Sequence, residues 1–216
     1  MSFIINPYQF ASAPASTTLL SENFEGPGAT GWTSSPSWNE TYNINPDFFT
    51  GDYGAEIDCG TSAQNAFKNF TSSPKVYCRF YVAAQTFTTA TGTLATIRTP
   101  TGTVLATFGL VTNSNAARAN SGGGSVTSGT GPDINDLWYG WFEYEKGTGS
   151  NAICRVGYTQ TQFRPSWPGS GASGRLAVSV SGTSTADAGR IMFGHTAVTG
   201  YNVILDNIEV RNTPFP

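Results

Sequence analysis

Two glutamates spaced two residues apart are the first candidates for chemistry. Glu143 and Glu145 flank Tyr144 in a segment of alternating side-chain types, so on a β-strand they share one face, roughly 6 to 7 Å apart. Two carboxylates around one bond are what a glycosidase needs. The same face would carry Tyr139 and Trp141 and run into a Lys-Gly turn. We interpret it as a solvent-exposed strand end, because carboxylates are seldom buried.

The single histidine, His195, is the second candidate. A serine hydrolase would need it as a base, but the chain has no Gly-x-Ser-x-Gly elbow and no reactive cysteine beside it. A polysaccharide lyase needs a tyrosine or histidine base with arginine and glutamine or asparagine neighbours. These residue types are present but form no diagnostic cluster in the sequence. We therefore predict no catalytic residues and a chain that is not an enzyme.

Aromatic residues in two loop-rich stretches suit sugar binding better. Trp38 and Tyr42 lie in one stretch, and Arg164 and Trp167 lie in the other. Aromatic rings provide the apolar walls of a small-ligand site, and neighbouring polar groups orient the ligand. The alternative is that these aromatic residues cover the ends of the core or an oligomer interface. Both interpretations stay open at this point.

The first 18 residues differ from the rest. Five apolar side chains precede a small-residue stretch from Ala11 to Thr18 that resembles a flexible connector. The apolar residues are Phe3, Ile4, Ile5, Tyr8 and Phe10. The segment has no lysine or arginine and is a poor secretory signal. We predict an anchoring arm over 1–18, docked on its own domain or on a partner, and one domain over 19–216.

Composition excludes several classes of function. Lysine and arginine total 11, the net charge is −3, and no basic stripe is present, so we expect no nucleic-acid partner. No apolar run approaches the length of a membrane span, so we expect no membrane partner. Three cysteines fit no zinc spacing and are interpreted as small buried apolar residues, although one disulfide stays open. Low charge and an apolar arm favour a homo-oligomer.

The elements that would position these residues are β-strands. Between 75 and 84 the side chains alternate, with Val76, Cys78, Phe80 and Val82 on one face, as in a half-buried strand. Predicted strands cover 75–84, 93–99, 103–111, 138–146, 152–160, 175–181, 190–194 and 201–211. The strands 93–99 and 103–111 are joined through Pro100-Thr101-Gly102, a short connection that predicts a hairpin. In 138–146 the side chains of Trp138, Phe142 and Tyr144 are expected to face one way. The stretches 113–136 and 160–174 are predicted as long loops. This succession of antiparallel strands indicates an all-β sandwich or barrel, most simply a jelly roll.

Two motifs support that choice. The stretch from Glu22 to Trp32 and the final Leu205-Asp206-Asn207-Ile208 strand resemble concanavalin A-like (laminin-G-like) jelly rolls and jelly-roll carbohydrate-binding modules. The resemblance implies an antiparallel jelly-roll β-sandwich over roughly residues 19 to 212. It also implies that calcium, where the family has it, bridges the first and last strands at Glu25 and Asp206. No cofactor is otherwise required.

The opening residues 1–10 resemble the start of bacteriophage structural proteins with appended jelly-roll domains. This resemblance implies a virion surface or structural protein, such as a capsid decoration, fibre or tail-surface protein. Its expected partners are other virion proteins, through the arm, and glycans on cells or mucus. The alternatives are a secreted carbohydrate-binding module and a polysaccharide-degrading enzyme of the same fold.

Overall fold

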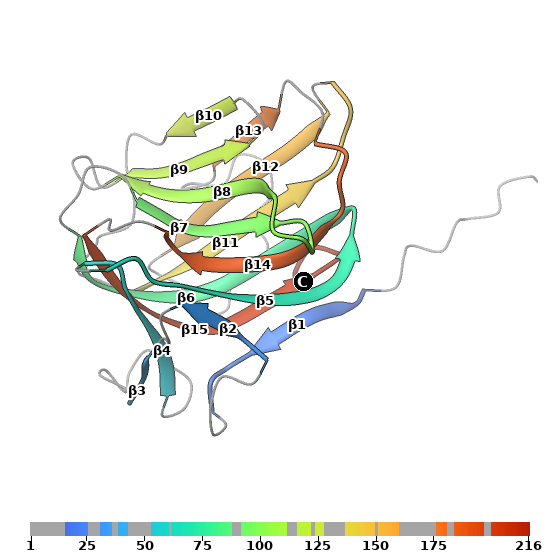
Figure 1. Cartoon of the computed structure of the whole chain (residues 1–216). Helices are drawn as coiled ribbons and strands as arrows, with labels where there is room; N and C mark the ends of the chain where they lie inside the picture. Colours follow the sequence, from blue (N-terminus) through green and yellow to red (C-terminus); the bar gives the residue numbers. More distant parts are fainter. Residues whose placement is uncertain are drawn as a thin grey trace, which may run out of the picture.

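The computed structural model describes residues 16–25, 31–35, 39–42, 53–60, 62–87, 92–111, 116–121, 124–127, 137–149, 151–159, 176–180, 184–196 and 200–216. Within these ranges the chain forms β-strands and their connections, arranged as two antiparallel sheets that pack face to face (Figure 1). The predicted all-β sandwich is confirmed. No helix among the described residues is long and apolar enough to cross a membrane.

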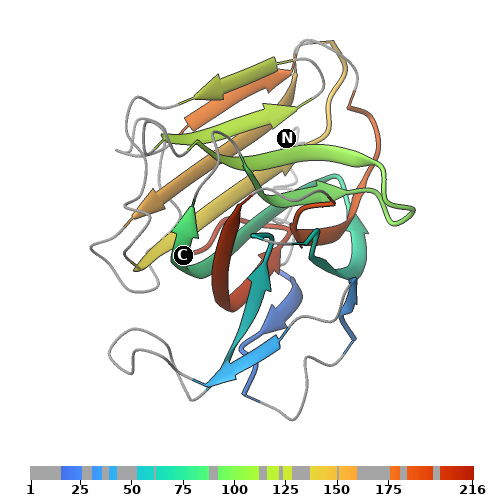
Figure 2. The ribbon, with the colours of Figure 1, turned by 60° about the vertical axis from the view of Figure 1, so that its left-hand side comes forward.

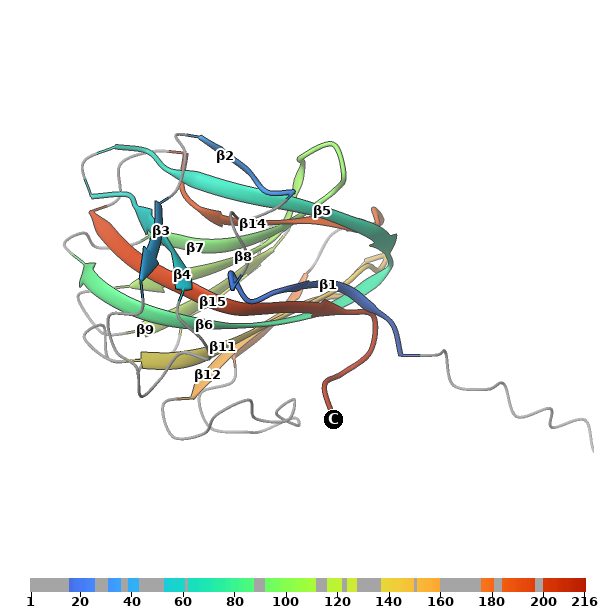
Figure 3. The same cartoon turned by 90° about the horizontal axis from the view of Figure 1, so that it is seen from below.

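One sheet, called sheet A here, contains both ends of the described chain. Its strand order is β13-β12-β11-β6-β15-β4-β3, with β1 also paired to β15. The strands are β1 (Thr18–Glu22), β3 (Asn39–Tyr42), β4 (Tyr53–Asp58), β6 (Lys75–Phe87), β11 (Leu137–Glu145), β12 (Ala152–Thr159), β13 (Leu176–Val180) and β15 (Tyr201–Arg211). Figure 3 shows β1, β15 and β6 side by side in this layer.

The other sheet, called sheet B, has the order β10-β9-β8-β7-β14-β5-β2. Its strands are β2 (Thr33–Ser35), β5 (Asn65–Ser73), β7 (Gly92–Arg98), β8 (Val104–Val111), β9 (Ala116–Ser121), β10 (Gly124–Thr127) and β14 (Ala188–Gly194). In Figure 2 the yellow-green strands of sheet B cross in front of the yellow and orange strands of sheet A. The predicted hairpin of 93–99 and 103–111 is confirmed as β7 and β8.

The core lies between the sheets and follows the predicted alternation. Val76, Cys78, Phe80 and Val82 of β6 are fully buried in it. Phe80 contacts Phe193 of β14 edge to face, with ring centroids 5.0 Å apart, an arrangement that aromatic pairs favour. Alternation therefore predicts which side chains of a strand point into the core. The side chains between them point to the outer face of the sheet.

The three cysteines are free and buried, as the interpretation of small apolar residues requires. Burial raises the pKa of Cys154 to about 12 and raises the pKa of Cys78 well above its ordinary value. Both thiols stay neutral at physiological pH, so they behave as core residues and not as nucleophiles.

The stretch 113–136 is not simply a loop, and that prediction is wrong. It contains β9 and β10, which pair with each other and, through β9, with β8. The β9 segment reads Ala-Ala-Arg-Ala-Asn-Ser, residue types that are mostly poor in β-propensity. It forms a strand because the edge of β8 offers backbone partners, which local sequence does not reveal. The predicted loop 160–174 lies outside the described residues.

The last strand, β15, changes its neighbour halfway along. Residues 202–205 pair with β4, and residues 208–211 pair with β1. The register on β6 shifts between Asp206 and Glu209, and Asn207 has a φ of 48°, a conformation that asparagine tolerates better than most residues. This bulge opens a fork in sheet A between β4 and β1.

The beginning of the described chain is tied to its end. Thr17 N–H donates to Asn212 Oδ1 at 2.9 Å, and the Thr213 hydroxyl bonds the Ser16 hydroxyl at 2.7 Å. The arm residues Phe3, Ile4, Ile5, Tyr8 and Phe10 lie outside the described residues. The anchoring role of the arm and its boundary at residue 18 therefore stay predictions.

Candidate functional site

The outer face of sheet B carries a row of residues at one level of three neighbouring strands. Arg118 of β9 pairs with Gly109 of β8, and Gly109 pairs with Thr93 of β7. The neighbours Phe108 and Ala119 point into the core, so the row faces outward. His195, which follows β14, lines the same hollow as this row. Four adjacent strands thus contribute to one place on the surface.

The hollow exists because Gly109 has no side chain to fill it. A Cβ atom on Gly109 would lie 3.2 Å from the Gly92 carbonyl oxygen and 3.6 Å from Arg118 Cβ. Any side chain at position 109 would therefore project into the space. The hollow has a volume of about 210 Å³, which is below the range of drug-sized pockets and suits a single sugar unit. Its lining residues are Gly92, Thr93, Thr107, Gly109, Arg118, Asn120 and His195.

A tight turn places the histidine. Gly194 has a φ of 86°, and a Cβ atom there would overlap the Gln64 carbonyl oxygen. The same carbonyl accepts a hydrogen bond from His195 N–H at 2.9 Å. Only glycine fits this left-handed position without strain, so the backbone holds His195 at the rim of the hollow.

The lining is cationic and rich in hydrogen-bond donors. Arg118 and His195 are its titratable members, and the described lining residues include no carboxylate. Arg118 Nε is buried and has no hydrogen-bond partner in the described part of the chain. A buried donor of this kind costs about 1–3 kcal/mol unless an acceptor reaches it. The arrangement is suited to a ligand that carries a carboxylate or another oxyanion.

The hollow also changes an interpretation made from sequence. Arginine, asparagine and histidine were expected to form no lyase-like cluster, yet Arg118, Asn120 and His195 line one hollow. Sequence reasoning missed this because the stretch 113–136 was interpreted as a loop. Alternation of Arg118 and Asn120 around the buried Ala119 was the only local signal.

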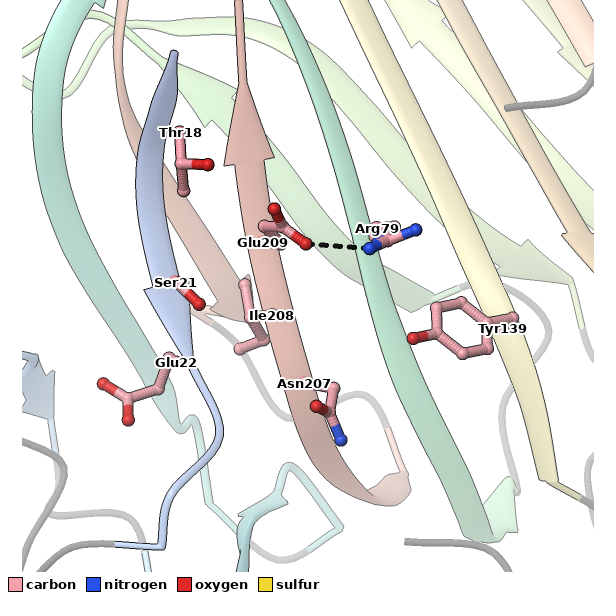
Figure 4. Close-up of a pocket in the computed structure, with 8 residues that line it drawn as sticks. All are labelled: Thr18, Ser21, Glu22, Arg79, Tyr139, Asn207, Ile208 and Glu209. Atoms are coloured by element: carbon pink, nitrogen blue, oxygen red, sulfur yellow. Dashed lines mark hydrogen bonds and ion pairs between the residues drawn. The ribbon is translucent and has the colours of Figure 1, made fainter. Parts of the chain in front are cut away.

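The outer face of sheet A is built differently. Ser21 of β1 pairs with Glu209 of β15, Glu209 pairs with Arg79 of β6, and Arg79 pairs with Trp141 of β11. Here the cation has a carboxylate as its direct neighbour, and Arg79 Nη2 lies 2.9 Å from Glu209 Oε2 (Figure 4). Arg211 Nε also lies 2.6 Å from Glu209 Oε1. The guanidinium groups on this face are thus held by the protein itself.

The glutamate pair belongs to the same face, and its predicted exposure is wrong for Glu143. Its side chain is only 1% exposed, and its Oε1 lies 2.8 Å from Arg155 Nη1. Glu145 Oε2 lies 2.6 Å from Lys75 Nζ. Burial opposes the charge of Lys75, but hydrogen bonds to Glu145 and Tyr77 outweigh it and raise the Lys75 pKa. Arg155 stands directly opposite Glu143 on β12, a pairing that sequence spacing could not reveal.

The predicted sugar-binding residues are not brought together by the described structure. Trp38, Arg164 and Trp167 lie outside the described residues. Tyr42 ends β3, where its backbone pairs with Tyr53, and its side chain is outside the description. A sugar platform formed by these four residues stays a prediction.

Calcium binding at Glu25 and Asp206 also stays a prediction. Asp206 is fully buried, and its two carboxylate oxygens accept hydrogen bonds from Asn207 N–H at 2.6 Å and Asn207 Nδ2 at 2.8 Å. Glu25 Oε1 accepts Tyr53 N–H at 3.2 Å. Among the described residues, neither carboxylate joins a group of three or more metal-binding side chains, whereas calcium takes 6–8 oxygen ligands.

No protein-family model and no curated protein matches the chain. Solved structures do match. A marine alginate lyase from Aplysia kurodai aligns with a TM-score of 0.61 at 9% identity, covering 91% of this chain and 100% of that one. An endo-β-1,4-glucuronan lyase from Trichoderma reesei aligns with a TM-score of 0.57 at 10% identity, covering 91% and 96%. A sialidase aligns with a TM-score of 0.61 at 9% identity, and the chain spans only 18% of its length.

These likenesses bear on two predictions. The predicted jelly-roll β-sandwich is confirmed. The prediction that the chain is not an enzyme is wrong. It is contradicted by two polysaccharide lyases that share this chain's fold over 96% and 100% of their own length. A binding domain of a botulinum neurotoxin also aligns, with a TM-score of 0.58 at 8% identity over 92% of this chain and 49% of that one. The chain thus shares its fold with carbohydrate-active proteins and with a toxin binding domain.

Proposed function

We propose that this chain binds an acidic polysaccharide in the sheet B hollow and cleaves it by β-elimination. The observation that carries the proposal is the set of Arg118, Asn120 and His195 around one hollow whose described lining has no carboxylate. A uronate sugar offers the carboxylate that such a lining lacks. The likeness in fold to alginate and glucuronan lyases supports the choice of substrate class.

Each lining residue has a role in this proposal. Arg118 and Asn120 bind the uronate carboxylate and stabilise the negative charge that develops on it. His195, as the base, takes the proton from the carbon next to that carboxylate. The electron pair forms a carbon–carbon double bond, and the glycosidic carbon–oxygen bond at the neighbouring carbon breaks. The leaving oxygen takes up the proton that His195 has abstracted, which returns His195 to its starting form, so the products are a saturated end and an unsaturated end.

The test is turnover of alginate, glucuronan and pectate, followed by the ultraviolet absorbance of the new double bond. We expect Arg118→Gln and His195→Ala each to lower kcat/KM by about 100-fold or more. The matched control is Arg190→Gln. Arg190 lies on β14 of the same sheet, 4.0 Å over the Phe67 ring and bonded to Asn69 Oδ1 at 2.8 Å, and it does not line the hollow.

Two results would contradict the proposal. One is the absence of unsaturated product from all three polymers under conditions where the protein is folded. The other is turnover that survives in both Arg118→Gln and His195→Ala. Turnover lost equally in Arg190→Gln would show that any arginine change on this sheet has the same effect, and would also count against the assigned roles.

We propose further that residues 1–18 mount the domain on a virion surface, as part of a capsid decoration, fibre or tail-surface protein. The support is that Ser16 and Thr17 are bonded to Thr213 and Asn212 beside sheet A, whereas the hollow lies on sheet B. An arm attached beside sheet A would leave the sheet B hollow on the side of the domain that faces away from the virion. Deleting 1–12 should abolish incorporation into particles and leave the unfolding transition unchanged. Truncated protein that still incorporates would contradict this.

A further inference from the structure

The strand β7 is irregular where it lines the sheet B hollow. Its register on β8 shifts between Thr93 and Ala95, and the consecutive residues Leu94 and Ala95 are both buried in the core. A bulge of this kind places an extra residue in one strand and re-aims a neighbouring side chain, and bulges are frequent beside active sites. Thr93, which precedes the bulge, stands across from Gly109 and lines the hollow. The position of Thr93 therefore depends on what holds the bulge.

A side chain of the opposite sheet holds this bulge from behind. Tyr201 begins β15 in sheet A, and β15 and β7 belong to opposite layers (Figure 3). The Tyr201 side chain is fully buried, and its hydroxyl donates a hydrogen bond to the Thr93 carbonyl oxygen at 2.7 Å. Burial raises the pKa of Tyr201 well above its ordinary value. The hydroxyl therefore keeps the proton that it donates throughout the neutral pH range.

Cys59 supports the histidine side of the hollow in a similar way. The Cys59 thiol is fully buried and donates to the Gln64 carbonyl oxygen at 3.1 Å. That carbonyl oxygen also accepts the hydrogen bond from His195 N–H at 2.9 Å. Cys59 N–H in turn donates to the Tyr201 carbonyl oxygen at 2.7 Å. Tyr201 and Cys59 are thus joined through their backbones, and each side chain bonds a carbonyl behind one side of the hollow.

We propose that Tyr201 and Cys59 are positioning residues of the sheet B hollow, Tyr201 for the wall at Thr93 and Cys59 for the base His195. This role rests on the proposed function, because it concerns how the same hollow fits a uronate chain. Neither side chain is among the described lining residues, so both act through the backbone.

The two supports act on different steps. Without the Tyr201 hydroxyl, the bulge relaxes and the Thr93 wall no longer fits the sugar, which weakens binding before and during the reaction alike. Without the Cys59 thiol, the Gln64 carbonyl keeps only its bond from His195 among the hydrogen bonds described above, and the base shifts. Proton transfer requires the base within hydrogen-bond reach of the proton, so this change slows the chemical step.

The test separates kcat from KM on the acidic polymer that the unsubstituted protein cleaves. Isothermal titration with hexamers of mannuronate, glucuronate and galacturonate gives Kd independently of turnover. We expect Tyr201→Phe to raise KM and Kd by about tenfold and to leave kcat within about twofold, because small displacements at a binding wall are costly. Cys59→Ala should lower kcat by at least about threefold and leave Kd unchanged.

The matched control is Tyr144→Phe. Tyr144 of β11 is also fully buried, and its hydroxyl donates to the Ala186 carbonyl oxygen at 2.8 Å, but it is not among the described lining residues of the hollow. Both tyrosine variants lose one buried hydroxyl group, so urea denaturation should show a loss of stability in each. KM, kcat and Kd should change only in Tyr201→Phe, which a merely structural role would not produce.

Unchanged KM and Kd in Tyr201→Phe, or equal rises in Tyr144→Phe, would overturn the role of Tyr201. Unchanged kcat in Cys59→Ala would overturn the role of Cys59, and this variant decides the proposal if Tyr201→Phe does not fold. An unsubstituted protein that binds none of the three acidic hexamers would contradict the proposed function itself. An unsubstituted protein that binds a hexamer no more tightly than Tyr201→Phe does would contradict only the positioning role.

Discussion

Two arginines on opposite faces of the sandwich have opposite surroundings. Arg79 in sheet A stands directly across from Glu209, while Arg118 in sheet B stands directly across from Gly109. Arg79 is therefore held by an ion pair and by the ring of Phe215. Arg118 faces a hollow, and its Nε has no hydrogen-bond partner among the described residues. The residue type is the same, and the cross-strand neighbour decides whether a carboxylate of the protein pairs with it.

The difference extends to the rest of each face. In sheet A, Lys75, Arg155 and Arg211 each lie within 2.8 Å of a glutamate oxygen. These three cations of sheet A are therefore each paired with a carboxylate of the protein itself. In sheet B, the described lining of the hollow contains cationic and neutral donors. This contrast leads us to expect acidic ligands at the sheet B hollow.

The largest expected effect comes from giving Arg118 the neighbour that Arg79 has. Gly109→Glu places a carboxylate across from Arg118 and fills the hollow. We expect kcat/KM on an acidic polysaccharide to fall about 100-fold or more, because the new charge repels the substrate and satisfies the arginine. The control is Gly109→Gln, which has similar bulk and no charge. Equal loss in both variants would show that bulk alone matters and would weaken the electrostatic comparison.

The next largest effect comes from removing the neighbour of Arg79. Glu209→Ala leaves Arg79 and Arg211 without their shared carboxylate. These side chains are 13–23% exposed, so solvent relieves part of the penalty, and we expect a loss of about 2 kcal/mol in the free energy of unfolding. Urea denaturation measures it. A loss below about 0.5 kcal/mol would mean that sheet A does not depend on its ion pairs, and the contrast would fail.

A third expectation uses alkaline pH. The described groups with raised pKa lie on strands of sheet A: Lys75, Tyr77, Cys78, Tyr144, Cys154 and Tyr201. Burial raises the pKa of the Cys154 thiol from 9.0 to about 12. The native state keeps a proton that the unfolded state loses, so stability is complete below pH 9 and declines between pH 9 and 12.

For Cys154 alone, the decline is about 1.4 kcal/mol for each pH unit. Urea denaturation at pH 8 and pH 10 should therefore show a smaller difference in Cys154→Ala than in the unsubstituted protein. The comparison of slopes is unaffected by any constant loss from the smaller side chain. Equal slopes in the two proteins would show that the thiol does not titrate on unfolding in this range.

The smallest expected effect is on the stability of Arg118→Gln. Because Arg118 makes no ion pair with the described residues, its replacement should change the free energy of unfolding by less than about 0.5 kcal/mol. Urea denaturation beside Glu209→Ala gives the comparison directly. A loss of about 2 kcal/mol would mean that Arg118 is a structural residue like Arg79, and the proposed binding role would lose its basis.

Much of the fold could be predicted from local pattern. The alternation around Val76 to Val82 and in Trp138 to Tyr144 identified the inner faces of β6 and β11, and the short Pro/Gly connection identified the β7–β8 hairpin. The pattern failed at β9, where Ala119 is buried between two polar residues and the segment resembles a loop. A strand stabilised by backbone pairing with β8 has little local signal, because backbone hydrogen bonds do not depend on side-chain type.

The sequence by itself determined that the chain is an all-β sandwich, since its period-two alternation and its turns admit few other solutions. Tertiary structure decided which residues became neighbours. Glu209 reaches Arg79, 130 residues away, and Arg155 reaches Glu143 only through strand register. A shift of one residue in register would exchange these contacts. The charged contacts on each face therefore depend on how the strands pair, and strand pairing cannot be predicted from local sequence.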